Sequence, residues 1–197
     1  ESGTGKLLRI SPDARKLEVL ADSYDGYRFA TVKDLAIGSK GDLFVSSPLS
    51  GTVYRIRPED GFIGVLNQDL VMVEGLSLSP DGKRLVAAEP DASRVVVFDL
   101  PLELQAVNSW TLVDFSPSGL EPKGLAFDES GLLYVSLGDR EKIRIFDLEK
   151  GIEVGILDAE GVAEILMYFD GYLYVSGPNG IRRIDPRPKE PVSVQND

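Results

Sequence analysis

The chain has 197 residues, no cysteine, no histidine and a formal net charge of −11, from 32 acidic residues against 21 Lys and Arg. The missing side chains exclude, within this chain, disulfides, thiolate nucleophiles, cysteine zinc sites and every triad or metal site that needs imidazole. The acidic balance argues against a nucleic-acid partner, which needs a basic surface, and no apolar run approaches the roughly 18 residues of a membrane span.

The chain opens on a single hairpin pattern. Residues 5–20, GKLLRISPDARKLEVL, place alternating apolar residues on both sides of a Ser-Pro-Asp turn, which predicts two antiparallel strands. Later in the chain the same pattern always follows another hairpin, but none precedes it here. We therefore expect residues 1–28 to form half of a repeating unit, in a chain that is truncated on its N-terminal side.

A second hairpin pattern occurs four times. Each copy joins a short β-branched or aromatic run to an alternating apolar run through a tight turn that contains glycine. The turn glycines lie 41, 49 and 40 residues apart. They are Gly41, Gly82, Gly131 and Gly171. A spacing of this size is typical of stacked β units, most often the blades of a propeller.

Each copy is followed by the outer hairpin pattern, so a unit contains four strands. We expect blades at about 29–70, 71–119, 120–160 and 161–197, which adds up to about four and a half blades in one domain. The fold class predicted for residues 1–197 is therefore an all-β propeller. Because each blade buries its faces against its neighbours, we expect missing upstream blades or a protein partner to complete the ring.

The repeats lack the WD and kelch signatures. Residues 75–100, GLSLSPDGKRLVAAEPDASRVVVFDL, resemble a segment of the gluconolactonase (SMP-30) family and of the related strictosidine synthase-like proteins. Residues 123–151 resemble the following blade of that family, and the TGKLLRISPDARKLEVLAD segment near the start resembles another of its segments. NHL propellers, which share much of the hairpin pattern, are the second choice.

The resemblance implies a six-bladed ring with Ca²⁺ or a similar divalent cation in its central channel. Hydrolytic members of the family act on lactones or phosphotriesters. The family's ligands are a Glu of the first blade and Asn, Asn and Asp residues that directly precede inner-strand apolar runs. Counting eight residues back from the turn glycines, the matching positions here are Lys33, Glu74 and Lys123.

Of these three positions, only Glu74 offers a ligand to a cation, since ammonium groups have no lone pair and repel it. A shift of one residue would recover Asp34 but would place glycines at the other two positions. We therefore expect that the family's metal site is not preserved in this segment, with Glu74 as the one candidate metal ligand.

Lys33, Glu74 and Lys123 could still form a polar ring at one mouth of the channel, together with Glu164 of the shorter fourth hairpin. In one interpretation the lysines bind the carboxylate or phosphate of a small anionic ligand, and Glu74 orients one of them. In the other, the four side chains pair with one another and plug the channel.

Two functions follow. The favoured prediction is a non-catalytic propeller that binds a ligand or protein, or serves as a scaffold, with no catalytic residue and no cofactor firmly implied. The alternative is a divalent-cation-dependent hydrolase of the lactonase or esterase type. It would use Ca²⁺ or another divalent cation, Glu74 as one ligand and further ligands from outside this segment.

Overall fold

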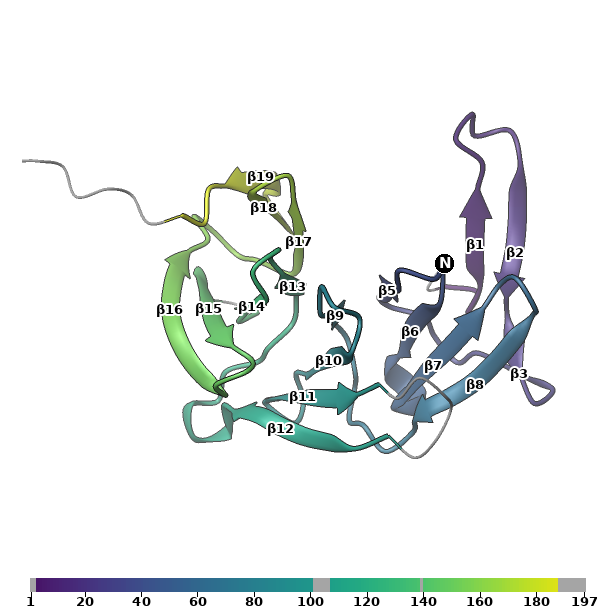
Figure 1. Ribbon diagram of the computed structural model, residues 1–197, viewed down its shortest axis with the longest axis horizontal. Helices are drawn as coiled ribbons and strands as arrows, with labels where there is room; N and C mark the ends of the chain where they lie inside the picture. The colour runs from purple at the N-terminus through teal and green to yellow at the C-terminus, as the bar shows by residue number, and fades with distance from the viewer. Residues whose placement is uncertain (1–2, 101–106, 139, 188–197) are drawn as a thin grey trace, which may run out of the picture.

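The computed structural model describes residues 3–100, 107–138 and 140–187 of the chain. Apart from two short 3₁₀ turns, η1 (Pro48–Ser50) and η2 (Ser116–Ser118), its regular elements are all strands, so the all-β prediction is confirmed. Figure 1 shows the sheets following one another along an arc, with β1 (Leu7–Ile10) and β2 (Leu17–Ala21) at one end.

Three complete sheets form the middle of the arc, and each has four antiparallel strands in chain order. The first contains β5 (Leu35–Ile37), β6 (Leu43–Ser47), β7 (Thr52–Arg57) and β8 (Phe62–Asn67). The second contains β9 (Leu76–Leu78), β10 (Arg84–Glu89), β11 (Arg94–Asp99) and β12 (Ser109–Asp114). The third contains β13 (Leu125–Phe127), β14 (Leu132–Ser136), β15 (Lys142–Asp147) and β16 (Ile152–Asp158).

The two ends of the arc hold smaller sheets. The β1–β2 hairpin is followed by a second two-stranded sheet, β3 (Ser23–Tyr24) with β4 (Tyr27–Arg28), which the sequence pattern did not predict. At the other end, β17 (Ile165–Phe169), β18 (Tyr172–Gly177) and β19 (Gly180–Ile184) form a three-stranded sheet. The fourth strand that the repeat predicts for the blade at 161–197 would fall mainly on residues 188–197, which lie outside the described residues.

The turn glycines close the inner hairpins as the repeat predicts. Gly82 and Gly131 adopt φ values of +70° and +90°, a region that glycine enters without steric cost. In each turn the glycine N–H donates to a carbonyl three residues earlier, that of Ser79 or Asp128. The side chain of Asp128 also accepts the N–H of Ser130 and of Leu132, so the turn is held from both sides.

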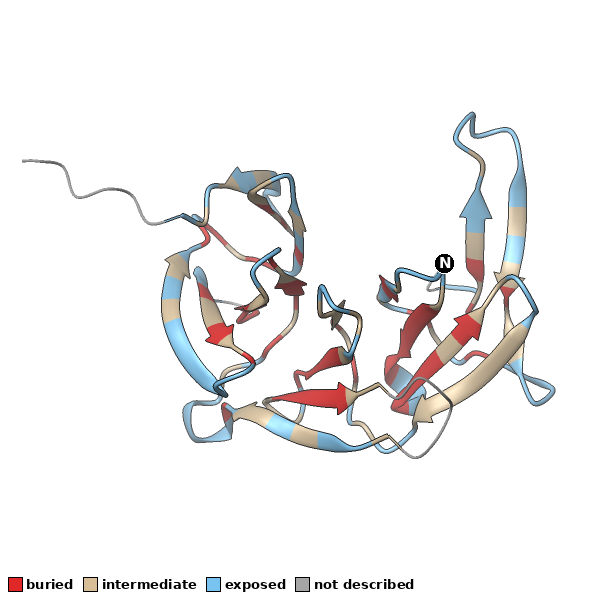
Figure 2. Ribbon diagram, viewed as in Figure 1, coloured by how far each residue is buried: buried red, intermediate tan, exposed pale blue. Residues whose placement is uncertain are grey.

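The core lies between successive sheets. In β10, Leu85 and Ala87 pack toward the first four-stranded sheet, whereas Val86 and Ala88 pack toward the third. All four are fully buried, and Figure 2 shows buried residues concentrated in the second and third strands of the middle sheets. Burying a large side chain such as leucine or valine contributes about 1.5–3 kcal/mol, so contact between sheets is the main stabilising term.

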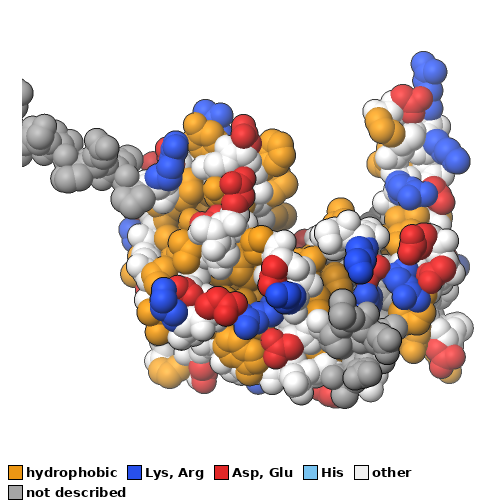
Figure 3. All heavy atoms as spheres, in the orientation of Figure 1, with side chains coloured by type: hydrophobic (Ala, Val, Ile, Leu, Met, Phe, Trp, Pro, Cys, Tyr) orange, Lys and Arg blue, Asp and Glu red, His pale blue; other side chains and the backbone are white. Residues whose placement is uncertain are grey.

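The ends of the arc differ from its middle. Apolar side chains are exposed on both terminal sheets, and Figure 3 shows apolar side chains at the surface at both ends. The exposed apolar residues include Ile10, Leu17 and Val19 of the β1–β2 hairpin, and Ile165, Met167, Phe169 and Ile181 of the β17–β19 sheet. Among the described residues no helix is long and apolar enough to cross a membrane.

Candidate functional site

The four residues predicted at the channel mouth occupy one repeated backbone position. Each lies one or two residues before an inner strand and donates its N–H to a carbonyl of the second strand of its own sheet, at 2.9–3.0 Å. The pairs are Lys33 with Ser46, Glu74 with Ala88, Lys123 with Ser136, and Glu164 with Ser176. The count of eight residues back from the turn glycines therefore selects structurally equivalent residues in three hairpins. Glu164, seven residues before Gly171, occupies the same position in the shorter fourth hairpin.

The structure brings all four side chains to one small cavity of about 40 Å³. The ammonium of Lys33 lies 4.0 Å from the carboxylate of Glu74, and the two side chains are 52% and 23% exposed. A pair this long and this exposed contributes little binding energy. The side chains of Lys123 and Glu164 form no ion pair or hydrogen bond with any described residue. The four side chains therefore do not close into a mutual network.

Glycines set how closely the blades meet at this mouth. A Cβ atom on Gly75 would lie 2.0 Å from the carbonyl oxygen of Lys123, and one on Gly124 would lie 2.8 Å from that of Glu164. Real side chains do not tolerate such distances from backbone atoms, so both positions require glycine. Glu74 and Lys123 are consequently each followed by a glycine that touches the next blade, which fixes the spacing from Glu74 to Lys123 and from Lys123 to Glu164.

Asp34 takes the place that glycine holds in the next two blades. One of its carboxylate oxygens accepts the N–H of Leu35 at 2.8 Å, and the other accepts the N–H of Leu76, in the next sheet, at 2.8 Å. Burial raises the pKa of the Asp34 carboxyl, although both hydrogen bonds act in the opposite direction. Sequence reasoning set this residue aside, and the signal for it was its place directly after Lys33.

Two buried serine hydroxyls form hydrogen bonds with backbone groups beside the mouth residues. The Ser46 hydroxyl donates to the carbonyl of Glu74 at 2.8 Å and accepts the N–H of Asp34. Ser136 accepts the N–H of Gly124 at 2.8 Å. Both hydroxyls are thus committed to backbone groups, and the chain has no histidine that could activate either as a nucleophile. They position the mouth residues.

The residues at the mouth do not fit a divalent cation. Oxygen-ligated cations such as Ca²⁺ take six to eight oxygen ligands, and here the carboxylates of Asp34, Glu74 and Glu164 stand beside two ammonium groups. Both oxygens of Asp34 already accept backbone N–H groups. In the part of the chain that the structure describes, no three acidic side chains come together as a metal site. What this arrangement offers chemically is positive charge for an anion and carboxylates for proton transfer.

Comparison with known proteins gives a consistent family. The family model described as "SMP-30/Gluconolactonase/LRE-like region" matches residues 2–165. A gluconolactonase of Zymomonas mobilis is 26% identical over 159 residues, which cover 69% of this chain and 44% of that protein. The lactonase drp35 of Staphylococcus saprophyticus is 28% identical over 166 residues, covering 77% of this chain and 48% of that protein. The chain thus spans just under half the length of these two relatives.

Further matches agree on fold and family. The Arabidopsis thaliana protein "strictosidine synthase-like 7" is 24% identical over 148 residues, which cover 66% of this chain and 38% of that protein. A solved structure of a putative gluconolactonase superposes with a TM-score of 0.79 at 22% identity, covering 92% of this chain and 67% of that one. At that identity the likeness shows the fold, and the predicted propeller class is confirmed.

These findings correct the favoured functional prediction. The sequence was interpreted as a non-catalytic binding or scaffold propeller, because the family's ligand positions read Lys33, Glu74 and Lys123. That prediction is wrong: the relatives are named as gluconolactonase and lactonase enzymes, which favours the hydrolase alternative. The predicted resemblance to this family is confirmed, since one family model covers most of the residues. The chain belongs to the SMP-30/gluconolactonase/LRE-like family.

Proposed function

We propose that this chain acts in the hydrolysis of a lactone or a related ester, and that the substrate binds at the channel mouth. The observation that carries the proposal is the convergence of Lys33, Glu74, Lys123 and Glu164 on one cavity, in a propeller whose relatives are named as lactonases. Because the chain spans less than half of those relatives, the substrate of the whole protein is part of the proposal.

The two lysines supply the electrostatic part of the reaction. A lactone carbonyl at the mouth gains negative charge on its oxygen when water attacks the carbonyl carbon. The ammonium groups of Lys33 and Lys123 stabilise that charge, because the blades hold them at the mouth before the reaction begins. The same groups then hold the carboxylate of the hydroxy-acid product.

Glu164 serves as the general base. Its exposed side chain has no ion pair with the described residues, so its carboxylate is free to accept a proton from the attacking water. As the tetrahedral intermediate collapses, the ring C–O bond breaks and Glu164 returns the proton to the departing alkoxide oxygen. One water is consumed, and one hydroxyl and one carboxyl group are formed.

Among the described residues, Glu74 is the only one that we propose as a ligand for a divalent cation. The described residues do not form a cation site by themselves, so further ligands would come from outside them, and no step above is assigned to a metal. Glu74 also orients Lys33, to which it is paired at 4.0 Å.

The test is lactone opening measured by acid release at constant pH, with D-glucono-1,5-lactone and a five-membered lactone as substrates. We expect turnover above the buffer rate, and a loss of about 100-fold in kcat for Glu164→Gln, as is typical when a general base is removed. Glu129→Gln, on the opposite face, is the matched control and is expected to keep full activity. Lactone opening no faster than in buffer, or equal rates for both variants, would contradict the proposal.

The same assay, together with a metal titration, tests whether a divalent cation binds at Glu74 and is needed for turnover. Calorimetric titration with Ca²⁺ and turnover with and without a chelator are compared between the unmodified chain and Glu74→Gln. Weaker metal binding in the variant, together with chelator-sensitive turnover, supports Glu74 as a ligand. Unchanged metal affinity and turnover would remove Glu74 from any such site.

A further inference from the structure

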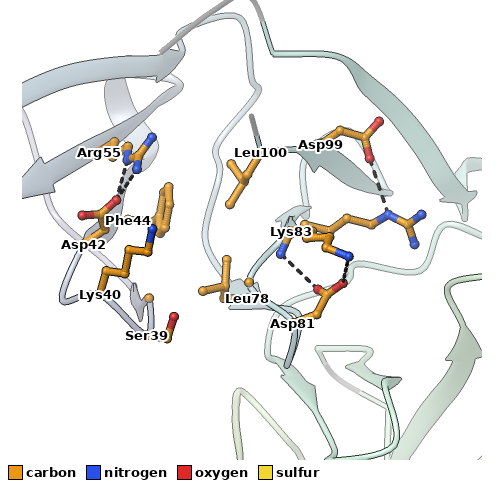
Figure 4. A pocket seen from close by; sticks show the side chains of 13 residues that line it. Ser39, Lys40, Asp42, Phe44, Arg55, Leu78, Asp81, Lys83, Asp99 and Leu100 are labelled. Atoms are coloured by element: carbon orange, nitrogen blue, oxygen red, sulfur yellow. Dashed lines mark hydrogen bonds and ion pairs between the residues drawn. The ribbon is translucent and has the colours of Figure 1, made fainter. Parts of the chain in front are cut away.

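A second candidate site lies on the face opposite the channel mouth, where the inner-hairpin turns are. We call it the first groove: a cavity of about 570 Å³ between the first and second four-stranded sheets. Its walls come from β6 and β7 on one side and from β9, β10 and the end of β11 on the other (Figure 4). This volume is within the usual range for small-molecule pockets.

The first groove combines an apolar surface with positive charge. Phe44, Leu78 and Leu100 provide its apolar lining, and Phe44 is itself buried against the core. Four cationic side chains surround that lining: Lys40, Arg55, Lys83 and Arg84. Figure 4 places Lys40, Phe44 and Arg55 on one wall and Lys83 on the other, with the two leucines between them.

The three carboxylates of the first groove are already engaged. Asp42 accepts two hydrogen bonds from the guanidinium of Arg55, and Asp99 lies 3.4 Å from Nε of Arg84. Asp81 accepts the Ser79 hydroxyl at 2.6 Å and the backbone N–H of Lys83 at 3.0 Å.

The two lysines are the available cations. Nζ of Lys83 is a loose 3.6 Å from Asp81, and Lys40 forms no ion pair within the described residues. Both lysines can therefore turn toward a ligand without breaking a strong contact.

The next pair of sheets provides an internal comparison. The second groove, a cavity of about 430 Å³ on the same face, lies between the second and third four-stranded sheets. It has only two cations, Arg84 and Lys150, each held by a carboxylate at 2.7 Å or less. Four carboxylates line it: Asp81, Glu129, Asp147 and Glu149. The same architecture is thus net acidic in one groove and net basic in the other, within a chain of formal charge −11.

We infer that the first groove binds a small organic carboxylate with an apolar body. The apolar body would cover Phe44, Leu78 and Leu100 and release water from them. The carboxylate would lie between Lys40 and Lys83, where it accepts charge-assisted hydrogen bonds. The second groove repels such a ligand because its carboxylates outnumber its cations.

Benzoate is the probe, and backbone amide shifts in nuclear magnetic resonance are the measurement. Titration of the full chain is expected to move the amides of Lys40, Gly41 and Lys83 and to leave those around Lys150 unchanged. Lys40→Ala and Lys83→Ala are each expected to weaken binding about tenfold, as is typical for a hydrogen bond to a charged group. Lys150→Ala is the matched control and is expected to bind benzoate normally. Benzyl alcohol, a neutral molecule of similar shape, is expected to bind at least about tenfold more weakly.

Three results would overturn the inference. One is the absence of saturable shifts up to the solubility of benzoate. A second is equal binding by Lys40→Ala, Lys83→Ala and Lys150→Ala. A third is equal binding of benzyl alcohol, which would show that only the apolar surface matters. All variants lie away from the channel mouth, so lactone opening by each one reports separately on the proposed activity.

Discussion

The two faces of the arc of sheets, the channel mouth and the face with the inner-hairpin turns, are built by different means. At the mouth, neighbouring blades meet through backbone atoms: Gly75 against the Lys123 carbonyl, and the Asp34 carboxylate on the N–H of Leu76. On the opposite face, the turn around Gly82 is stabilised within its own hairpin, and a Cβ atom on that glycine would meet no other atom within 4 Å. Close contact between blades therefore limits which residues can occupy the mouth, whereas the charged residues on the turn face can differ from one blade to the next.

The largest expected difference between the two faces is the loss in free energy of unfolding when one methyl group is added. Gly75→Ala forces a Cβ atom onto the Lys123 carbonyl and is expected to destabilise the fold by about 3 kcal/mol or more, at the upper end for overpacked positions. Gly82→Ala meets only the strain of a positive φ and is expected to cost about 1 kcal/mol. Urea unfolding of both variants measures the difference. Equal costs would show that the blades separate easily at the mouth.

A smaller difference is expected for the loss of a hydroxyl group. Ser136→Ala removes the acceptor of the buried Gly124 N–H and is expected to cost about 1–3 kcal/mol. Ser130→Ala removes a partly buried hydrogen bond from an exposed serine to Asp128, which keeps its other hydrogen bonds in the turn, and is expected to cost about 0.5 kcal/mol or less. The same unfolding measurement applies. A Ser136 variant as stable as the Ser130 variant would mean that water replaces the hydroxyl at the mouth.

The smallest effect is electrostatic: the shift in the pKa of a buried or hydrogen-bonded carboxyl has opposite signs on the two faces. Burial raises the pKa of Asp34, whereas hydrogen bonds from the Ser79 hydroxyl and the Lys83 N–H lower that of Asp81. Asp81 therefore adds stability that is present above its unfolded pKa and is lost as the pH falls through its lower folded value. Asp34 acts in the opposite sense: its contribution is present at low pH and is lost as the pH rises through its raised folded pKa.

Carboxyl-carbon resonances followed through an acid titration give both values directly. Asp34 is expected to titrate above the ordinary aspartate range, and Asp81 below it. An Asp34 that titrates together with or below Asp81 would show that the two backbone hydrogen bonds outweigh burial at the mouth.

The same contrast explains what the sequence could predict. The repeat places Lys33, Glu74, Lys123 and Glu164 at equivalent positions because one hairpin geometry recurs, and the backbone hydrogen bonds show that equivalence. The role of Asp34 could not be predicted, since its partner Leu76 is 42 residues away and belongs to another blade. The first groove was missed for a similar reason, because its two walls come from different units. The functional prediction went wrong because it judged activity from the family's ligand positions and from the open flank of an incomplete ring.

Strand β10 shows how a loss of packing in one blade would destabilise the blades on both sides of it. Leu85 and Val86 are adjacent in sequence but belong to different interfaces, one on each face of their sheet. A blade of this kind has no hydrophobic core of its own, so its folded structure depends on packing against both neighbouring blades. Amide exchange is therefore expected to be slowest in β10 and β11 and to quicken toward β1–β2 and β17–β19, so that unfolding proceeds inward from the ends.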